Sequence, residues 1–164
     1  MISDNSESAT VGTAVTTAPS VKVTDAQGNA VSGVSVTFTV ASGGGSLASP
    51  GSPVTVTSDS AGIATSPAWT LGTTAGANTL TATSGSLSGS PITFTATGTA
   101  GSVNQLAITT QPVGGASGAS LTTQPVVTIR DAQGNTVTSD SSTMVTVAIL
   151  SGTGGTLGVT SIGS

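Results

Sequence analysis

The side chains that could do acid–base chemistry in this sequence are few and mostly of one kind. The chain contains six Asp and Glu residues, two Lys and Arg residues, and no His, Cys or Tyr. General acid–base catalysis would therefore depend on carboxylates, which stand at Asp4, Glu7, Asp25, Asp59, Asp131 and Asp140. No spacing among them pairs two carboxyl groups, and a serine nucleophile would lack a histidine base. We expect no enzymatic activity, no catalytic residue and no cofactor.

Two of the carboxylates belong to a pentapeptide, DAQGN, which occurs at residues 25–29 and again at 131–135. Asp and Asn oxygens are ligands that Ca²⁺ accepts, but one Asp and one Asn per copy are few for a loop site. The alternative is a tight turn, in which the Asp accepts hydrogen bonds from backbone N–H groups and the Gly supplies a positive φ. We favour the turn and predict no metal site. The segment SDSAG at residues 58–62 is interpreted as a turn for the same reason.

Two further segments could suggest chemistry. SGGGS at residues 42–46 lacks the following Gly-Lys-Ser/Thr and the helix of a phosphate-binding loop, so we predict a flexible loop between strands. Lys22 could form an intramolecular isopeptide bond only if it were buried. The alternation of residues around Lys22 points it to solvent instead.

The charge balance excludes two classes of partner. The net charge is −4, and the basic residues are Lys22 and Arg130. A nucleic-acid surface needs clustered Lys and Arg to neutralise phosphates, and an anionic membrane surface attracts similar clusters. No apolar run approaches the roughly 20 residues of a membrane span. We expect neither nucleic-acid binding nor membrane insertion.

The elements that must position these residues are organised as a repeat with an offset of 106 residues. When residues 10–29 are aligned without gaps to residues 116–135, ten of the twenty positions are identical. This offset matches an immunoglobulin-sized module rather than a solenoid repeat. We predict a complete module over residues 1–98, a linker over 99–104 and the N-terminal half of a module over 105–164.

Alternation of apolar and polar residues predicts β-strands throughout the first copy. In VSVTFTV (34–40) the Val and Phe residues share one face, while Ser and Thr share the other. The segments VTVT, NTLTATS and ITFTATG alternate in the same way. About seven short strands separated by turns predict an all-β fold of tandem immunoglobulin-like β-sandwiches, the second of them incomplete.

The sequence contains few aromatic side chains to fill a core. They are Phe38, Trp69 and Phe94, and we assign all three to the interior of the first module. In IATSPAWTL, we expect Ile63, Trp69 and Leu71 to share the inward face. Pro cannot donate to a strand ladder, so the segment is an edge or is interrupted at its proline.

The quoted segments together resemble bacterial immunoglobulin-like repeats of the invasin and intimin kind. The pattern is TVGTAVTTAPSVKVTDAQGNAVSGVSVTF, then ASGGGSL, TSDSAGIAT, WTLGTTAGANTLTATSG and SPITFTATG. The resemblance covers nearly all of residues 1–98, and the second, truncated copy is similar to repeats that alternate with such modules in very large bacterial surface proteins. It implies an extracellular location on the bacterial cell surface. It also implies a stalk or adhesin in which most repeats are spacers and binding belongs to a terminal domain.

The second copy predicts a site of self-association. Its segment TMVTVAIL would expose apolar residues at a sheet edge, and the assembly edge that we assign consists of Val145, Val147, Ile149 and Leu150. The half module could be completed by the first module packing over it or by strands of a neighbouring copy. The second possibility would be β-strand addition and, repeated head to tail, would give a homopolymer. We therefore expect a structural stalk or filament subunit. The alternatives are a passive spacer from a large adhesin and, disfavoured by the scarcity of aromatics, a carbohydrate-binding surface module.

Overall fold

The computed structural model describes residues 6–48, 51–85, 87–149 and 156, and within them the chain is all-β. The strands, in chain order, are β1 (Glu7–Thr10), β2 (Ser20–Lys22), β3 (Ser35–Ser42), β4 (Ser46–Leu47), β5 (Val54–Thr57), β6 (Ile63–Thr65), β7 (Trp69–Thr70), β8 (Gly76–Thr83), β9 (Ile92–Thr99), β10 (Gln105–Thr110) and β11 (Val126–Arg130). The part of the chain that is described contains no helix long and apolar enough to cross a membrane.

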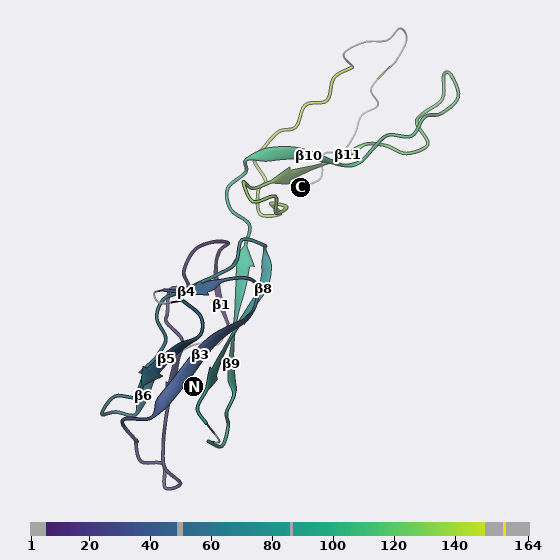
Figure 1. Cartoon of the computed structure of the whole chain (residues 1–164). Helices are drawn as coiled ribbons and strands as arrows, with labels where there is room; N and C mark the ends of the chain where they lie inside the picture. Colours follow the sequence, from purple (N-terminus) through teal and green to yellow (C-terminus); the bar gives the residue numbers. More distant parts are fainter. Residues whose placement is uncertain (1–5, 49–50, 86, 150–155, 157–164) are drawn as a thin grey trace.

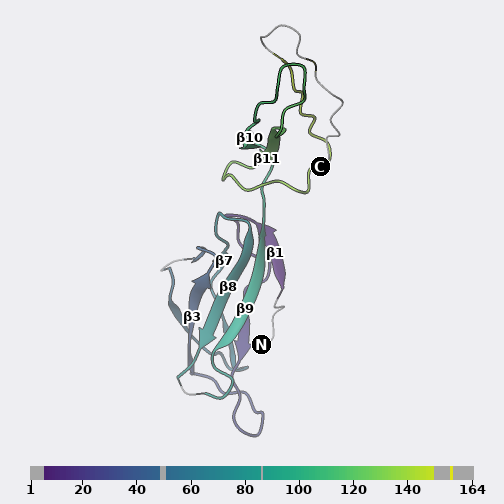
Figure 2. The same cartoon turned by 90° about the vertical axis from the view of Figure 1, so that its right-hand side faces the viewer.

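The molecule is elongated. Residues 6–99 form an N-terminal body, and residues 103–149 form a C-terminal part that extends beyond one end of that body (Figure 1, Figure 2). The two are connected through residues 100–102, which follow β9 directly. The loop between β2 and β3, which contains the first DAQGN segment, lies at the opposite end of the body (Figure 1).

Two layers of strands build the N-terminal body. One is a five-stranded sheet in the order β1-β9-β8-β3-β5, in which β1 runs parallel to β9 and the other pairs are antiparallel. The other layer consists of the pairs β2–β6 and β4–β7. Side chains from both layers form one cluster of buried apolar residues. This arrangement is consistent with the predicted β-sandwich class.

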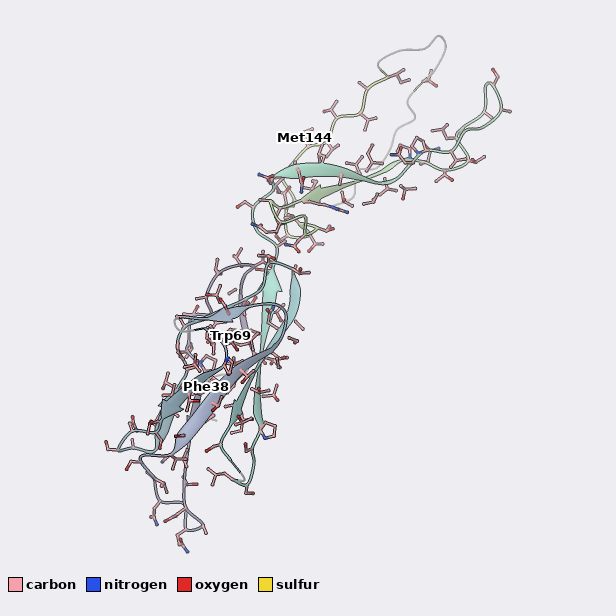
Figure 3. All side chains as sticks on the ribbon, viewed as in Figure 1. Phe38, Trp69 and Met144 are labelled. Atoms are coloured by element: carbon pink, nitrogen blue, oxygen red, sulfur yellow. The ribbon has the colours of Figure 1, made fainter. Side chains whose placement is uncertain are left out.

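The core is built around the three aromatic side chains. Phe38 on β3, Trp69 on β7 and Phe94 on β9 are each at most 1% exposed. Figure 3 labels Phe38 and Trp69 within the body. Leu80 of β8 lies directly opposite Phe94 and is also fully buried. Because large side chains contribute most of the apolar area removed from water, these few residues dominate the stability of the body.

The segment from β6 to β7 changes its alternation at the proline. Before Pro67, Ala64 is fully buried, while Ile63 is only half-buried. After Pro67, Trp69 and Leu71 face inward. The prediction that Ile63 shares the inward face with Trp69 is therefore wrong, because the interruption between β6 and β7 shifts the two-residue period by one position.

The SGGGS segment connects β3 to β4, as the predicted loop between strands requires, and two of its glycines lie close to other parts of the chain. Gly43 has a φ of 89°, and a side chain there would overlap the side chain of Asn78. A side chain at Gly72 would overlap the carbonyl oxygen of Gly43. Asn78 is fully buried, accepts a hydrogen bond from Gly72 N–H (3.0 Å) and donates one to the Gly76 carbonyl (3.2 Å). Glycine is required at these two positions because Gly43 approaches the Asn78 side chain and Gly72 approaches the Gly43 backbone, so the SGGGS segment packs against the loop after β7.

The C-terminal part is an open structure. Strands β10 and β11 pair antiparallel, with a register shift between Ile108 and Thr110. Within the described residues, β11 pairs with β10 along one edge and with no named strand along the other, where the Ile129 carbonyl accepts a hydrogen bond from Val137 N–H (2.9 Å). Residues 143–149, which we predicted to contribute a sheet edge, form no strand, because no neighbouring strand pairs with them there. Leu150 lies outside the described residues.

Replacing Trp69 by alanine is expected to lower the free energy of unfolding by about 3–5 kcal/mol, because it leaves a cavity in a fully packed core. Urea denaturation followed by circular dichroism measures this loss. Leu87, which is 45% exposed, provides the control, and Leu87→Ala is expected to change stability by less than about 0.5 kcal/mol. A loss below about 1 kcal/mol for Trp69→Ala would mean that the tryptophan does not support the core.

Candidate functional site

The first DAQGN segment forms a turn that is held by its own aspartate. Asp25 Oδ1 accepts hydrogen bonds from the backbone N–H groups of Gln27 (3.0 Å) and Asn29 (2.8 Å). Asp25 Oδ2 accepts a further hydrogen bond from Asn29 Nδ2 (3.0 Å). Gly28 has a φ of 87°, a conformation that side chains of L-residues rarely allow. The prediction of a turn is confirmed for this copy.

The second DAQGN segment repeats the same turn. Asp131 Oδ1 accepts hydrogen bonds from the backbone N–H groups of Gln133 (3.0 Å) and Asn135 (2.8 Å), and Asp131 Oδ2 accepts one from Asn135 Nδ2 (2.8 Å). Gly134 has a φ of 88°. The two pentapeptides thus use each residue in the same way, and the turn is a property of the local sequence.

The surroundings of the two turns differ. In the second turn, the side chain of Asn135 reaches the N-terminal body, where its Oδ1 accepts a hydrogen bond from the backbone N–H of Ala75 (2.8 Å). Its Nδ2 donates to the carbonyl oxygen of Thr73 (2.9 Å). One amide side chain therefore satisfies a donor and an acceptor of the loop that follows β7. We call this set of contacts the junction.

Asp131 completes the junction from inside. It is fully buried, and its Oδ2 also accepts a hydrogen bond from the backbone N–H of Gly101 (2.9 Å), between the two parts. Burial alone would raise the pKa of this carboxyl group, but hydrogen bonds from Asn135, Gly101 and Gln133 outweigh burial and hold the pKa below its ordinary value. The carboxylate is therefore charged at neutral pH and fixes the connection between the two parts.

The other described carboxylates also accept backbone N–H groups. Glu7 accepts from Thr16 and Thr17, and Asp59 and Asp140 accept from N–H groups two to four residues further along the chain. Hydrogen bonds from the hydroxyl groups that follow Asp140 lower the pKa of its carboxyl group to about 2. These acids are occupied in holding turns, and no two of them share a site.

The described residues contain no group of three or more His, Cys, Asp or Glu side chains that could hold a metal ion. Asp4, the remaining carboxylate, lies outside the described range.

One open groove of about 480 Å³ lies beside β2 and the hairpin between β8 and β9. Its apolar lining includes Val21, Leu87 and Ile92, and its polar lining consists of Lys22, Asp25 and short Ser and Thr side chains. No aromatic side chain lines the groove. Aromatic rings provide the flat apolar surface on which ligand rings stack, so this groove lacks the main feature expected of a carbohydrate site.

The residues assigned to the assembly edge lie in the C-terminal part. Val147 is 53% exposed, Ile149 is 46% exposed and Val145 is half-buried. Met144, labelled in Figure 3, is 87% exposed. These side chains are separate from the junction. Among the described hydrogen bonds, none joins residues 144–149 to Asp131 or Asn135.

Comparison of the sequence with protein-family models finds no match, and comparisons with curated proteins and with solved structures find none either. The function therefore has to be argued from the exposure, strand edges and contacts of the described residues.

The junction is the feature that sequence reasoning missed. The repetition of DAQGN identified the turn, but the partner of Asn135 lies 60 and 62 residues earlier in the chain. That partner is a pair of backbone groups at Thr73 and Ala75, which leaves no side-chain signal. The clue that could have found it is the position of the second turn, which follows a short small-residue linker after a complete set of strands.

Replacing Asn135 by alanine removes both hydrogen bonds between the C-terminal part and the body. We expect small-angle X-ray scattering to show a wider range of angles between the two parts. Asn29→Ala provides the matched control, since it removes the same bond within its own turn and none across the junction. Equal effects of the two substitutions, or no effect of either, would contradict the assignment of the junction.

The junction is also expected to depend on pH. The folded-state pKa of Asp131 lies below the unfolded value of about 3.9. Its contribution is therefore complete above that value and is lost as the pH falls through the lower, folded-state pKa. The amide proton of Gly101, followed by NMR, should shift with a midpoint below about pH 3.9, and Asp131→Asn should abolish this transition. A midpoint at or above the unfolded value would show that the carboxylate is not stabilised there.

Proposed function

We propose that this protein is a structural, non-enzymatic protein of the bacterial cell surface, a stalk or filament subunit that self-associates. In this proposal the chain consists of tandem immunoglobulin-like β-sandwiches, and the C-terminal part is the incomplete second one. It is completed by strands from another copy of the chain. The observation that carries the proposal is the concentration of exposed apolar side chains on the C-terminal part.

The distribution of these side chains is strongly uneven. Among the described residues, ten of the eleven exposed large apolar side chains lie between Val103 and Ile149, and the remaining one is Leu87. The N-terminal body buries its apolar residues in a common cluster, but the C-terminal part contributes no residue to that cluster. Contiguous exposed apolar surface on a water-exposed protein marks a site of interaction.

The strand edges support the same proposal. In the N-terminal body, β2 pairs with β6 through Val21 and Ala64. β11 occupies the equivalent place in the second copy, 106 residues later, and has no such partner among the described residues. An unpaired edge offers a row of N–H and C=O groups to another strand. An added strand would form backbone hydrogen bonds with the unpaired edge of β11, and its apolar side chains would cover the exposed apolar side chains of the C-terminal part.

Another copy of this chain is the occupant that fits the exposed face. Its strand β6 pairs with β2, which is the equivalent of β11. For β6 to pair with β11 of another copy it must first leave β2, so the completion is a strand exchange. The two copies have few charges to repel each other, since the net charge of each is −4 and the residues between 141 and 149 carry none. Repeated head to tail, such an exchange gives a filament.

A passive spacer is the second candidate, and the elongated arrangement with a fixed junction favours it. A spacer would transmit length and stiffness without assembling, and the closed N-terminal body suits that role. A carbohydrate-binding module is less well supported, because Phe38, Trp69 and Phe94 are all buried and the groove beside β2 contains no aromatic side chain.

Multi-angle light scattering at micromolar concentration tests the proposal. We expect a mass of many chains, each of about 15.4 kDa. The double variant Val147→Lys with Ile149→Lys should reduce the mass towards that of one chain, because it places charges on the apolar face that the partner covers. Thr93→Lys with Thr97→Lys adds the same charge at exposed positions of β9 in the N-terminal body and should assemble. A monomeric wild-type chain would refute self-association and leave the spacer.

A further inference from the structure

The two DAQGN turns have the same internal hydrogen bonds, yet one is docked and the other is free. In the first turn, Asp25 and Asn29 are exposed. Within the described residues, the Asn29 side chain bonds only to Asp25. In the second turn, Asp131 is fully buried and Asn135 makes two hydrogen bonds to the N-terminal body. The structure thus contains both the free and the docked state of one recognition element.

We propose that the Asp25–Asn29 turn is a docking surface for the end loop of another module of the same kind. Its partner presents a backbone N–H and a backbone C=O two residues apart, as Ala75 and Thr73 do in the junction. Asn29 Oδ1 accepts from the N–H group, and Asn29 Nδ2 donates to the carbonyl. Asp25 Oδ2 accepts from an N–H group of the connecting residues, as Asp131 does from Gly101.

The turn is prepared for this contact before the partner arrives. Its Gly28 conformation, its two backbone hydrogen bonds to Asp25 Oδ1 and its bond from Asn29 Nδ2 are already in place. The same bonds exist in the docked turn, so docking requires no change in the pentapeptide. A preformed surface loses little conformational entropy on binding, which favours the contact.

The partner must be a module whose end loop is unoccupied. In a separate copy of this chain, the Thr73–Ala75 loop is already bonded to that copy's own Asn135. A module linked on the N-terminal side of the turn has no such competitor. The link also raises its effective concentration, so that a few hydrogen bonds suffice.

The position of the turn gives the direction of assembly. It lies at the end of the body opposite the junction (Figure 1), so successive modules would dock end to end along one axis. This inference does not depend on strand exchange by the C-terminal part. A monomeric chain would refute the self-association proposed above and leave this docking surface unaffected.

A fusion protein tests the inference directly. Residues 1–106 are placed immediately before Met1 of the complete chain, which positions the added Thr73 and Ala75 at 62 and 60 residues before Asn29, the separations found in the junction. The added body has its own core, since every residue of the buried cluster lies within residues 6–99. The readout is the NMR signal of the Asn29 side-chain amide, with Asn135 of the same chain as the docked reference.

In the fusion protein, we expect the Asn29 side-chain amide signals to move to the positions of the Asn135 signals. Hydrogen exchange of that amide should slow by about fivefold, as one net hydrogen bond of average strength implies. Ala75→Pro in the added copy removes the N–H donor without altering the turn and should reverse both effects. Gln27→Ala, which keeps the backbone N–H that the turn uses, should preserve them.

Two results would overturn the inference. The first is an Asn29 signal in the fusion protein identical to that in the unfused chain. The second is a shift that persists with Ala75→Pro in the added copy, which would place the contact elsewhere. Raising the concentration of the unfused chain should leave the Asn29 signals unchanged, because the Thr73–Ala75 loop of each separate copy is bonded to its own Asn135. A shift of the Asn29 signals with concentration would overturn the requirement for a linked, unoccupied module.

Discussion

The hydrogen bond from a backbone N–H to a carboxylate is the interaction on which the ends of this molecule depend. The chain has only six acidic side chains, and each of those in the described residues accepts at least one backbone N–H. Hydrogen bonds to a charged group are stronger than those between neutral groups. These few carboxylates hold the loops between the Thr-rich strands by accepting hydrogen bonds from loop N–H groups.

This use of carboxylates connects local sequence to overall shape. Asp131 holds its turn and also binds Gly101, so the same carboxylate organises a loop and its connection to the preceding body. The turn places the Asn135 side chain against the loop after β7, where it accepts a hydrogen bond from Ala75 N–H. The buried side chain of Asn78 holds the same loop by accepting a hydrogen bond from Gly72 N–H. The connection between the two parts therefore rests on a series of hydrogen bonds from Asp131 and Asn135 to the linker and to the loop after β7.

Strand positions and the aromatic core could be predicted because alternation is a local property. The two-residue period places Phe38 and Phe94 on inward faces without knowledge of the partner strands, and both are buried. The two-residue period is interrupted at Pro67. Counting back from Trp69 in steps of two predicts that Ile63 faces inward, but Ala64 does so instead. A proline marks such a break, but the sequence does not tell which register resumes after it.

The Gly-rich loop and the junction were beyond sequence reasoning for a different reason. Gly43 and Gly72 are glycines because each would otherwise overlap a distant part of the chain, and composition alone cannot separate that requirement from flexibility. Asn135 binds backbone groups, which every residue possesses. In both cases the determining contact is long-range and its partner has no side-chain identity, so only the folded arrangement could reveal it.

The central claim, that another copy of the chain completes the C-terminal part, concerns the free edge of β11. Hydrogen–deuterium exchange of the backbone amides of Val127 and Ile129, which face away from β10, tests it most directly when it is measured over a series of protein concentrations. The account predicts that protection of these amides increases with concentration, while the amides of β8 stay protected throughout. Protection of β11 that is independent of concentration would contradict the claim.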